Sequence, residues 1–216
     1  MHPVTLRARR LPRRQGGFTA LEAMIAVSIL GILMAFGIPR MSGWLAATKA
    51  EGAGQFYVEG FALARAQALA HNSQSRLVFI DNPGGQPDWR VDICFRITGN
   101  ACDDASNDWS TPSTAAGGAP GESTAFRSIR RSAASLPPPG LLAVTLGPDD
   151  DGDAVYFTPT GWVDGSIAPR VTEIGLDPAA GKENAFRRSA VILTLAGIAT
   201  SCDPEVDPGD SRRCPQ

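Results

Sequence analysis

The sequence of 216 residues predicts an α+β fold, in which one long N-terminal α-helix packs on an antiparallel β-rich C-terminal domain. Three observations support this prediction. An apolar segment at 18–38 is followed at 43–71 by good helix formers with helical spacing of the apolar residues. From Ser75 onward, short apolar stretches alternate with turn residues. The 23 glycines and 17 prolines are too many for a helical bundle and suit strands joined by many turns.

Residues 1–17 form a basic leader that holds five arginines and no acidic residue: Arg7, Arg9, Arg10, Arg13 and Arg14. The apolar segment at 18–38 reaches the roughly 20 residues that span a bilayer, so its helix is predicted to be transmembrane. Because basic flanking residues stay in the cytoplasm, we expect a single-pass protein of the inner membrane with its C-terminal domain in the periplasm.

Other targeting signals share this pattern. A secretory signal peptide would be cut near residues 35–37, a plain membrane anchor would keep the segment, and arginine pairs at 9–10 and 13–14 are found in twin-arginine signals. None of these explains Glu22, an acidic residue inside the apolar segment. At mid-membrane its charge would cost about 2.5–3.5 kcal/mol, so a carboxylate in this place requires a partner.

Residues 39–73 are predicted to continue the helix as an amphipathic segment. Pro39 removes one hydrogen bond, and it either bends the helix or ends the membrane helix. Gly52, Gly54 and Gly60 weaken the helix locally, and Asn72-Ser73 is a plausible stop. The apolar stripe of this segment consists of Phe56, Val58, Phe61, Leu63, Ala64, Ala68 and Leu69.

Residues 74–200 are predicted to form the periplasmic β-rich domain. The segment 89–97 alternates apolar and polar residues, which predicts a strand that is buried on one face only. The Ser-, Gly- and Pro-rich stretches 99–123 and 132–140 are expected to be long surface loops. The strand candidates are 75–81, 89–97, 124–129, 141–146, 154–158, 162–165, 171–176 and 190–200.

The chain has four cysteines, and no two of them form a CxxC pair. With only two histidines in the chain, a zinc site is disfavoured. Two local disulfides in an oxidising compartment fit better, although three pairings are formally open. The simplest pairing joins Cys94 to Cys102 and Cys202 to Cys214, and the second bond would close the C-terminal tail at 201–216.

The remaining composition argues against an enzyme and against bound cofactors. A Ser-His-Asp triad would have to use His71, because His2 lies in the basic leader, and no Gly-rich nucleotide-binding loop is present.

The acidic run at 149–153 contains oxygen ligands of the kind that calcium binds, but its spacing does not complete an EF-hand loop and suits a hairpin turn. Without the leader, 15 basic and 22 acidic side chains remain, and this acidic balance disfavours nucleic acid.

The stretch Gly16-Gly17-Phe18-Thr19-Ala20-Leu21-Glu22, between a basic leader and an apolar helix, resembles the type III signal of type IV pilins and pseudopilins. The resemblance implies cleavage between Gly17 and Phe18 by a prepilin peptidase and N-methylation of Phe18. Glu22 would pair with the N-terminal amine of a neighbouring subunit during assembly, since a buried carboxylate needs a cationic partner. The alternative is an acidic residue that is stabilised by the N-terminus of its own helix.

The β-rich part is similar to the FimT/FimU/GspH group of minor pilins and pseudopilins. The similarity rests on an F-x-P-x-G stretch at 157–161, inside a predicted hairpin at 157–165, and on an apolar C-terminal strand that contains Gly197. Some FimT-like minor pilins bind DNA through a Gly-Arg-x-Arg stretch in this strand. Here the stretch at 197–200 reads Gly-Ile-Ala-Thr, so only the arginine pairs at 187–188 and 212–213 are left for a basic patch.

The resemblance therefore implies a non-enzymatic minor pilin that takes part in type IV pilus assembly, in a priming or tip complex. Its partners would be other major and minor pilins, the prepilin peptidase and the assembly platform of the inner membrane. Two alternatives remain open. One is a GspH-like pseudopilin of a type II secretion system, and the other is a DNA-binding minor pilin for natural transformation.

Overall fold

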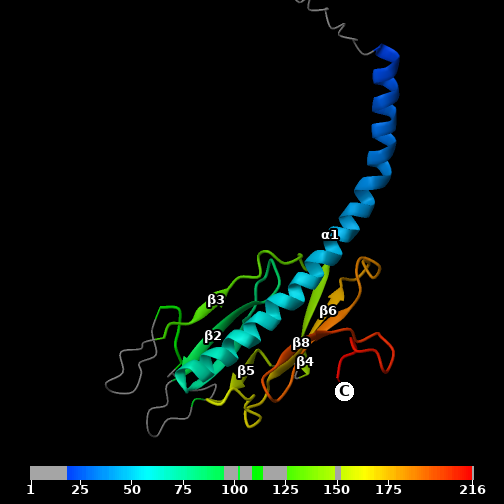
Figure 1. Cartoon of the computed structure of the whole chain (residues 1–216). Helices are drawn as coiled ribbons and strands as arrows, with labels where there is room; N and C mark the ends of the chain where they lie inside the picture. Colours follow the sequence, from blue (N-terminus) through cyan, green and yellow to red (C-terminus); the bar gives the residue numbers. More distant parts are fainter. Residues whose placement is uncertain (1–18, 95–101, 103–108, 114–125, 149–151, 216) are drawn as a thin grey trace, which may run out of the picture. The chain divides into compact units, whose positions relative to one another are not determined.

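A computed structural model of the chain describes residues 19–94, 102, 109–113, 126–148 and 152–215. The predicted α+β fold is confirmed: one helix is followed by two antiparallel sheets (Figure 1). The chain divides into two compact units between Ser42 and Gly43, and helix α1 (Ala20–His71) contributes residues to both. The second unit, Gly43–Gln216, is called the globular unit below.

Both ends of α1 are explained by local sequence. Thr19 caps the N-terminus, because its Oγ1 accepts a hydrogen bond from the backbone N–H of Glu22 at 3.2 Å. At the other end Asn72 adopts a positive φ of 47°, which asparagine tolerates better than most residues, and the Ser73 N–H donates to the Ala68 carbonyl. The helix therefore ends next to the predicted stop. It also continues through Pro39, so the alternative in which the helix ends there is wrong.

Within the described part of the chain, eight strands form two four-stranded sheets. The first has the order β3-β2-β1-β5 and the second the order β4-β6-β7-β8, and neighbouring strands are antiparallel in both. Within the globular unit, α1 lies against both sheets (Figure 1). The strands are β1 (Gln74–Ile80), β2 (Asp88–Cys94), β3 (Ile129–Arg131), β4 (Leu142–Pro148), β5 (Ala154–Phe157), β6 (Val171–Pro178), β7 (Ser189–Leu193) and β8 (Ala199–Cys202).

The core of the globular unit lies between α1 and the two sheets. Two glycines allow the helix to approach closely: a Cβ on Gly60 would lie 3.2 Å from the Trp89 ring of the first sheet, and a Cβ on Gly54 would lie 3.5 Å from Leu176 of the second. These glycines therefore allow close packing of the helix on the sheets, in addition to lowering the local helix propensity. Of the predicted stripe, Phe56, Phe61, Ala64 and Ala68 are buried, Val58 and Leu63 are half-buried, and Leu69 is 47% exposed. The prediction omitted Tyr57 and Ala53, which are fully buried.

Several strand predictions need correction. Residues 162–165 do not form a strand, because only Val163 makes an isolated bridge to Phe157. Residues 190–200 form two strands rather than one, since the chain turns between β7 and β8, where Gly197 has a positive φ of 75°. The strand predicted at 124–129 begins only at Ile129, and residues 124–125 lie outside the described part of the chain.

Strand β2 is buried on both faces, so the prediction of one exposed face is wrong. The carboxylate of Asp92 on the expected polar face is fully buried, and it accepts hydrogen bonds from Arg76 at 3.0 Å and from Arg90 at 2.7 and 3.0 Å. The Arg76 guanidinium lies 4.5 Å from the centroid of Trp109, which is itself buried. The segment around Trp109 thus covers the face of β2 that the alternation of apolar and polar residues had predicted to be exposed.

Candidate functional site

The first candidate site lies at the N-terminus of α1. Glu22 is the third residue of the helix and is exposed, and among the residues that the structure describes its carboxylate has no ion-pair partner. Thr19 at the cap, followed by an acidic residue three positions later, matches the capping-box pattern, and the bond observed is the one from the Glu22 backbone N–H to the Thr19 hydroxyl. The predicted cleavage and methylation residues, Gly17 and Phe18, lie outside the described residues.

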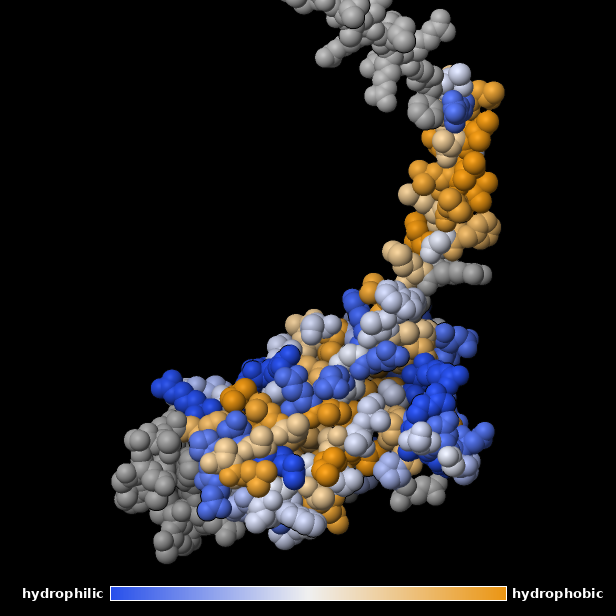
Figure 2. All heavy atoms as spheres, in the orientation of Figure 1, coloured by the Kyte–Doolittle hydropathy of each residue, from blue (hydrophilic) through white to orange (hydrophobic). Residues whose placement is uncertain are grey.

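The apolar part of α1 is uncovered in the monomer. Residues Ala20–Ile38 are long enough to cross a membrane, about 28 Å at 1.5 Å per residue, and none of them is buried (Figure 2). Such a surface is suited to contact with lipid or with other apolar helices, because in water it would leave a large apolar area exposed. The large side chains that are more than half exposed are Leu21, Met24, Ile25, Val27, Ile29, Leu30, Ile32, Leu33, Met34, Phe36 and Ile38.

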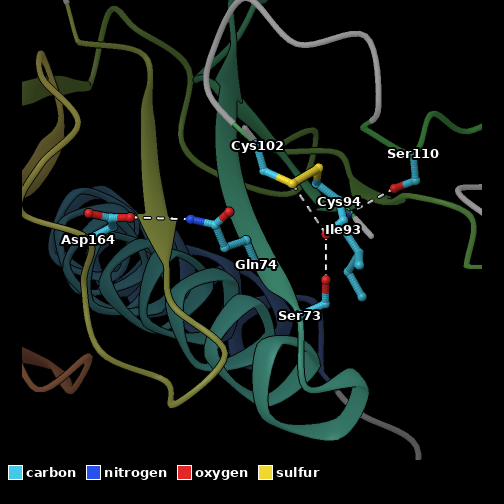
Figure 3. The surroundings of a disulfide bond; sticks show 7 residues. All are labelled: Ser73, Gln74, Ile93, Cys94, Cys102, Ser110 and Asp164. Carbon is cyan, nitrogen blue, oxygen red and sulfur yellow. Dashed lines mark hydrogen bonds between the residues drawn. A yellow bond between two sulfur atoms is a disulfide. The ribbon is translucent and has the colours of Figure 1, made fainter. Parts of the chain in front are cut away.

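The first disulfide joins Cys94, at the end of β2, to Cys102 (Figure 3). Both residues are buried, and the Cys94 carbonyl accepts a hydrogen bond from the hydroxyl of Ser73 directly after α1. One residue earlier, the Ile93 N–H donates to the Ser110 hydroxyl at 3.0 Å, and the Ser110 N–H donates to the Ile93 carbonyl at 2.9 Å. The disulfide and these bonds tie the segment around Ser110 to the edge of the sheet.

The second disulfide joins Cys202, the last residue of β8, to Cys214 in the C-terminal tail. Of the three open connectivities, the structure therefore has the one with two local disulfides. The tail folds back on itself, because the Asp203 N–H donates to the Arg212 carbonyl at 2.8 Å. Arg188 connects the tail to β6, with its guanidinium 2.5 Å from Asp177 and 3.6 Å from Glu205.

Two of the four arginines proposed as a basic patch, Arg188 and Arg212, are ion-paired with acidic neighbours. The hydrogen bond to Asp177 raises the pKa of Arg188, and the hydrogen bonds from Arg212 lower the pKa of Asp210 to about 2. A cavity of about 710 Å³ lies beside these residues, and its lining includes Glu51 and Asp203 as well as three arginines. Mixed charge of this kind does not select a phosphate backbone.

The described residues offer no metal centre, because they contain no cluster of three or more His, Cys, Asp or Glu side chains that could hold an ion. The acidic run at 149–153 lies mostly outside them, since residues 149–151 are not described. The carbonyl of Asp153 accepts a hydrogen bond from the Phe79 N–H at 2.7 Å, so this end of the run is part of the sheet edge.

The structure also reveals a feature that the sequence analysis missed, a pair of equivalent turns. Residues 158–162 (TPTGW) and 194–198 (TLAGI) share the pattern Thr-x-x-Gly-apolar. In the first turn the Thr158 N–H donates to the Trp162 carbonyl at 2.8 Å, and in the second the Thr194 N–H donates to the Ile198 carbonyl at 3.0 Å. In each turn the threonine hydroxyl also accepts the N–H of the last residue. A search for repeated five-residue patterns would have found them.

Comparison with known proteins adds one match. Residues 12–38 match the family described as "Prokaryotic N-terminal methylation motif", and this range holds the predicted cleavage residues, Glu22 and the apolar segment. Comparisons with curated proteins and with solved structures gave no match. The motif implies interaction with other pilins and with their assembly machinery, and it points to a structural protein. Together with the apolar N-terminal helix, the prepilin-type motif indicates a type IV pilin-like protein.

Proposed function

We propose that the chain is a minor pilin of the FimT/FimU/GspH group that takes part in type IV pilus assembly, in a priming or tip complex. The observation that carries the proposal is the combination of the prepilin-type motif at 12–38 with an apolar helix segment, Ala20–Ile38, that is entirely uncovered. A helix of this kind is suited first to the inner membrane and then to a bundle of similar helices.

The peptidase would cleave between Gly17 and Phe18 and leave Phe18 as a methylated N-terminal residue. The new α-amino group would be a cation at the start of an apolar helix, four residues before Glu22. A carboxylate and an ammonium group that both enter an apolar bundle are each costly alone and stabilise one another when paired. The Glu22 carboxylate would accordingly pair with the amine of a neighbouring subunit and set the axial register between the two helices.

The globular unit would stay in the periplasm and make lateral contacts with other major and minor pilins. Its two disulfides suit an oxidising compartment. The basic leader would face the cytoplasm, where the prepilin peptidase would remove it. A pseudopilin of a type II secretion system has the same N-terminal features and is the second candidate. DNA binding is not proposed, because the 197–200 stretch has no arginine and two of the four nearby arginines, Arg188 and Arg212, are ion-paired.

A complemented in-frame deletion strain tests the proposal, with surface pili and twitching scored beside type II secretion. Loss of pili with normal secretion supports the minor pilin. Loss of secretion with normal pili supports the pseudopilin and contradicts the minor-pilin proposal.

The role of Glu22 is tested in the same strain with Glu22→Val. We expect normal cleavage, read as an intact mass beginning at methylated Phe18, but strongly reduced incorporation into sheared filaments. Ser28→Ala is the matched control, because the Ser28 hydroxyl only donates to the Met24 carbonyl of its own helix. Normal incorporation of the Glu22 variant would contradict the assigned role.

A further inference from the structure

The globular unit carries an exposed apolar surface at the end where α1 terminates. It consists of Leu69 in α1 and of Trp162, Leu195 and Ile198 in the paired turns, which are 47%, 57%, 62% and 53% exposed. We call these four residues the distal patch. Exposed apolar clusters of this kind mark interaction surfaces more often than isolated apolar residues do.

Hydrogen bonds and close packing hold the backbone around the distal patch in place. The Val163 N–H donates to the Leu195 carbonyl at 2.9 Å, which joins the two turns, and Arg65 donates its Nε–H to the Gly161 carbonyl at 3.1 Å, which joins them to α1. A Cβ on Gly161 would lie 3.1 Å from Leu69. The backbone of both turns is therefore fixed, and the apolar side chains at their tips face solvent with little freedom to fold inward.

A second exposed apolar group lies at the opposite end of the same helix segment. Trp44 and Leu45, in the first turn of α1 within the globular unit, are 69% and 49% exposed. We call these two residues the proximal patch. The 25 helical positions from Trp44 to Leu69 correspond to about 38 Å. The two patches thus cannot cover one another within one molecule.

The charges next to the patches are complementary. Arg65 adjoins the distal patch and Glu51 lies two turns of α1 beyond Trp44, and neither has an ion-pair partner among the described residues. If a second molecule is placed head to tail, the Arg65 guanidinium beside one apolar patch meets the Glu51 carboxylate beside the other, in the lining of a cavity that also includes Arg187, Arg188 and Arg212. Complementary charge of this kind favours one orientation of the two partners and disfavours the reverse.

We propose that the distal patch of one copy of the chain binds the proximal patch of a second copy, with Arg65 of one molecule facing Glu51 of the other. The contact is heterologous, because two different surfaces meet, so it extends along an axis instead of closing into a dimer. The proposal deepens the proposed function, on which it rests, by naming a second copy as the neighbour along the filament. A priming complex would then contain at least two adjacent copies.

Photo-cross-linking tests the contact in the full-length chain. Benzoylphenylalanine replaces Trp162, cells are irradiated, and cross-linked peptides are identified by mass spectrometry. The expected adduct joins position 162 to residues 44–51 of a second copy. Benzoylphenylalanine at Ile129, on β3 and 38% exposed, is the matched control and should not give this adduct. An adduct only with another protein, or none in filaments that contain the chain, overturns the proposal.

The same measurement on detergent-solubilised full-length protein separates this contact from the proposed function. If the chain never enters a filament, the proposed function fails, but a concentration-dependent adduct in detergent still supports the contact. Absence of the adduct in detergent as well overturns the contact. The variant Trp44→Ser should weaken the self-association about tenfold or more, since it removes a large aromatic anchor. An unchanged adduct yield in that variant counts against the proposal, whereas Glu22→Val should leave the yield in detergent unchanged.

Discussion

Trp89 on β2 donates its indole N–H to the main-chain carbonyl oxygen of Phe56 in α1, across 3.1 Å. The ring is 1% exposed, so its donor would be unsatisfied without this bond. One helical turn after Phe56, Gly60 leaves the space that the same ring occupies. A side chain of the sheet therefore fixes how α1 is rotated about its axis in the globular unit.

A larger side chain at position 60 should destabilise the globular unit. In Gly60→Val a new Cβ would lie 3.2 Å from Trp89 and 3.3 Å from Leu77, and the ring cannot retreat without losing its bond to Phe56. We expect a loss of about 1–3 kcal/mol in the free energy of unfolding, measured by urea denaturation. Gly52→Ala is the control, because open space surrounds Gly52, and it should gain about 0.5–1 kcal/mol from helix propensity. Equal stability of the two variants would contradict the packing.

The contact between the paired turns gives a second prediction. Gly197 has a φ of 75°, and a Cβ there would lie 2.3 Å from the Gly161 carbonyl oxygen. Gly181 has nearly the same φ of 78°, but open space surrounds it. Gly181→Ala should cost only the left-handed backbone strain of about 1–2 kcal/mol. Gly197→Ala should cost distinctly more, seen as a lower melting temperature. A similar loss in both variants would show that the turns are not in contact.

Removal of the Cys202–Cys214 bond should destabilise the globular unit. The bond closes a loop with a sequence separation of 12, for which chain entropy gives about 3 kcal/mol. We expect a loss of this size in the double variant Cys202→Ser/Cys214→Ser, measured by thermal unfolding. Arg188→Ala removes only exposed ion pairs of the same tail and should change the free energy of unfolding by less than about 1 kcal/mol. A larger effect of Arg188→Ala would mean that the ion pairs, and not the disulfide, hold the tail.

The stability of the globular unit should depend on pH through Asp88. Burial alone would raise the pKa of this carboxyl, but hydrogen bonds from the Ala133 N–H and from Arg130 outweigh burial and lower the pKa below its ordinary value of 3.8. A lowered folded-state pKa stabilises the fold above the ordinary value, and this contribution is lost as the pH falls through the lowered pKa.

The variant Asp88→Asn isolates this contribution. Its deficit in the free energy of unfolding relative to the wild type should be largest at pH 5–7 and shrink as the pH falls below about 4. Urea denaturation at pH 7, 5, 4 and 3 measures the difference. A deficit of constant size from pH 7 to pH 3 would show that the Asp88 carboxylate does not carry the effect.

Local patterns predicted much of the fold correctly. The helical spacing around Phe56, Phe61 and Ala64 identified the buried face of α1, and the short apolar stretch at 154–158 identified β5. The helix prediction succeeds because the period of the apolar residues directly reflects which side of the helix is buried. The strand prediction succeeds because a short continuous apolar stretch is typical of a fully buried strand. The apolar segment before Pro39 was equally clear, since its length and lack of charge depend on no other part of the chain.

The errors arose where distant residues decide the outcome. Asp92 looked exposed because its partner Arg76 on β1 and the covering Trp109 are not visible in the local alternation. The run 190–200 looked like one strand because it is mostly apolar, and only the contact of Gly197 with the other turn shows that the chain reverses there. Cleavage at Gly17 and pairing of Glu22 with a neighbour remain predictions, because they involve a protease and a second chain.

The close approach at Gly197 also constrains how this protein can evolve. The atom that a new side chain would meet is the main-chain oxygen of residue 161, which every amino acid possesses. No second-site substitution at 161 can therefore compensate for the loss of glycine at 197. Homologues that share this pair of turns should keep glycine at 197, and lineages that lose it should show an insertion or deletion in one of the turns.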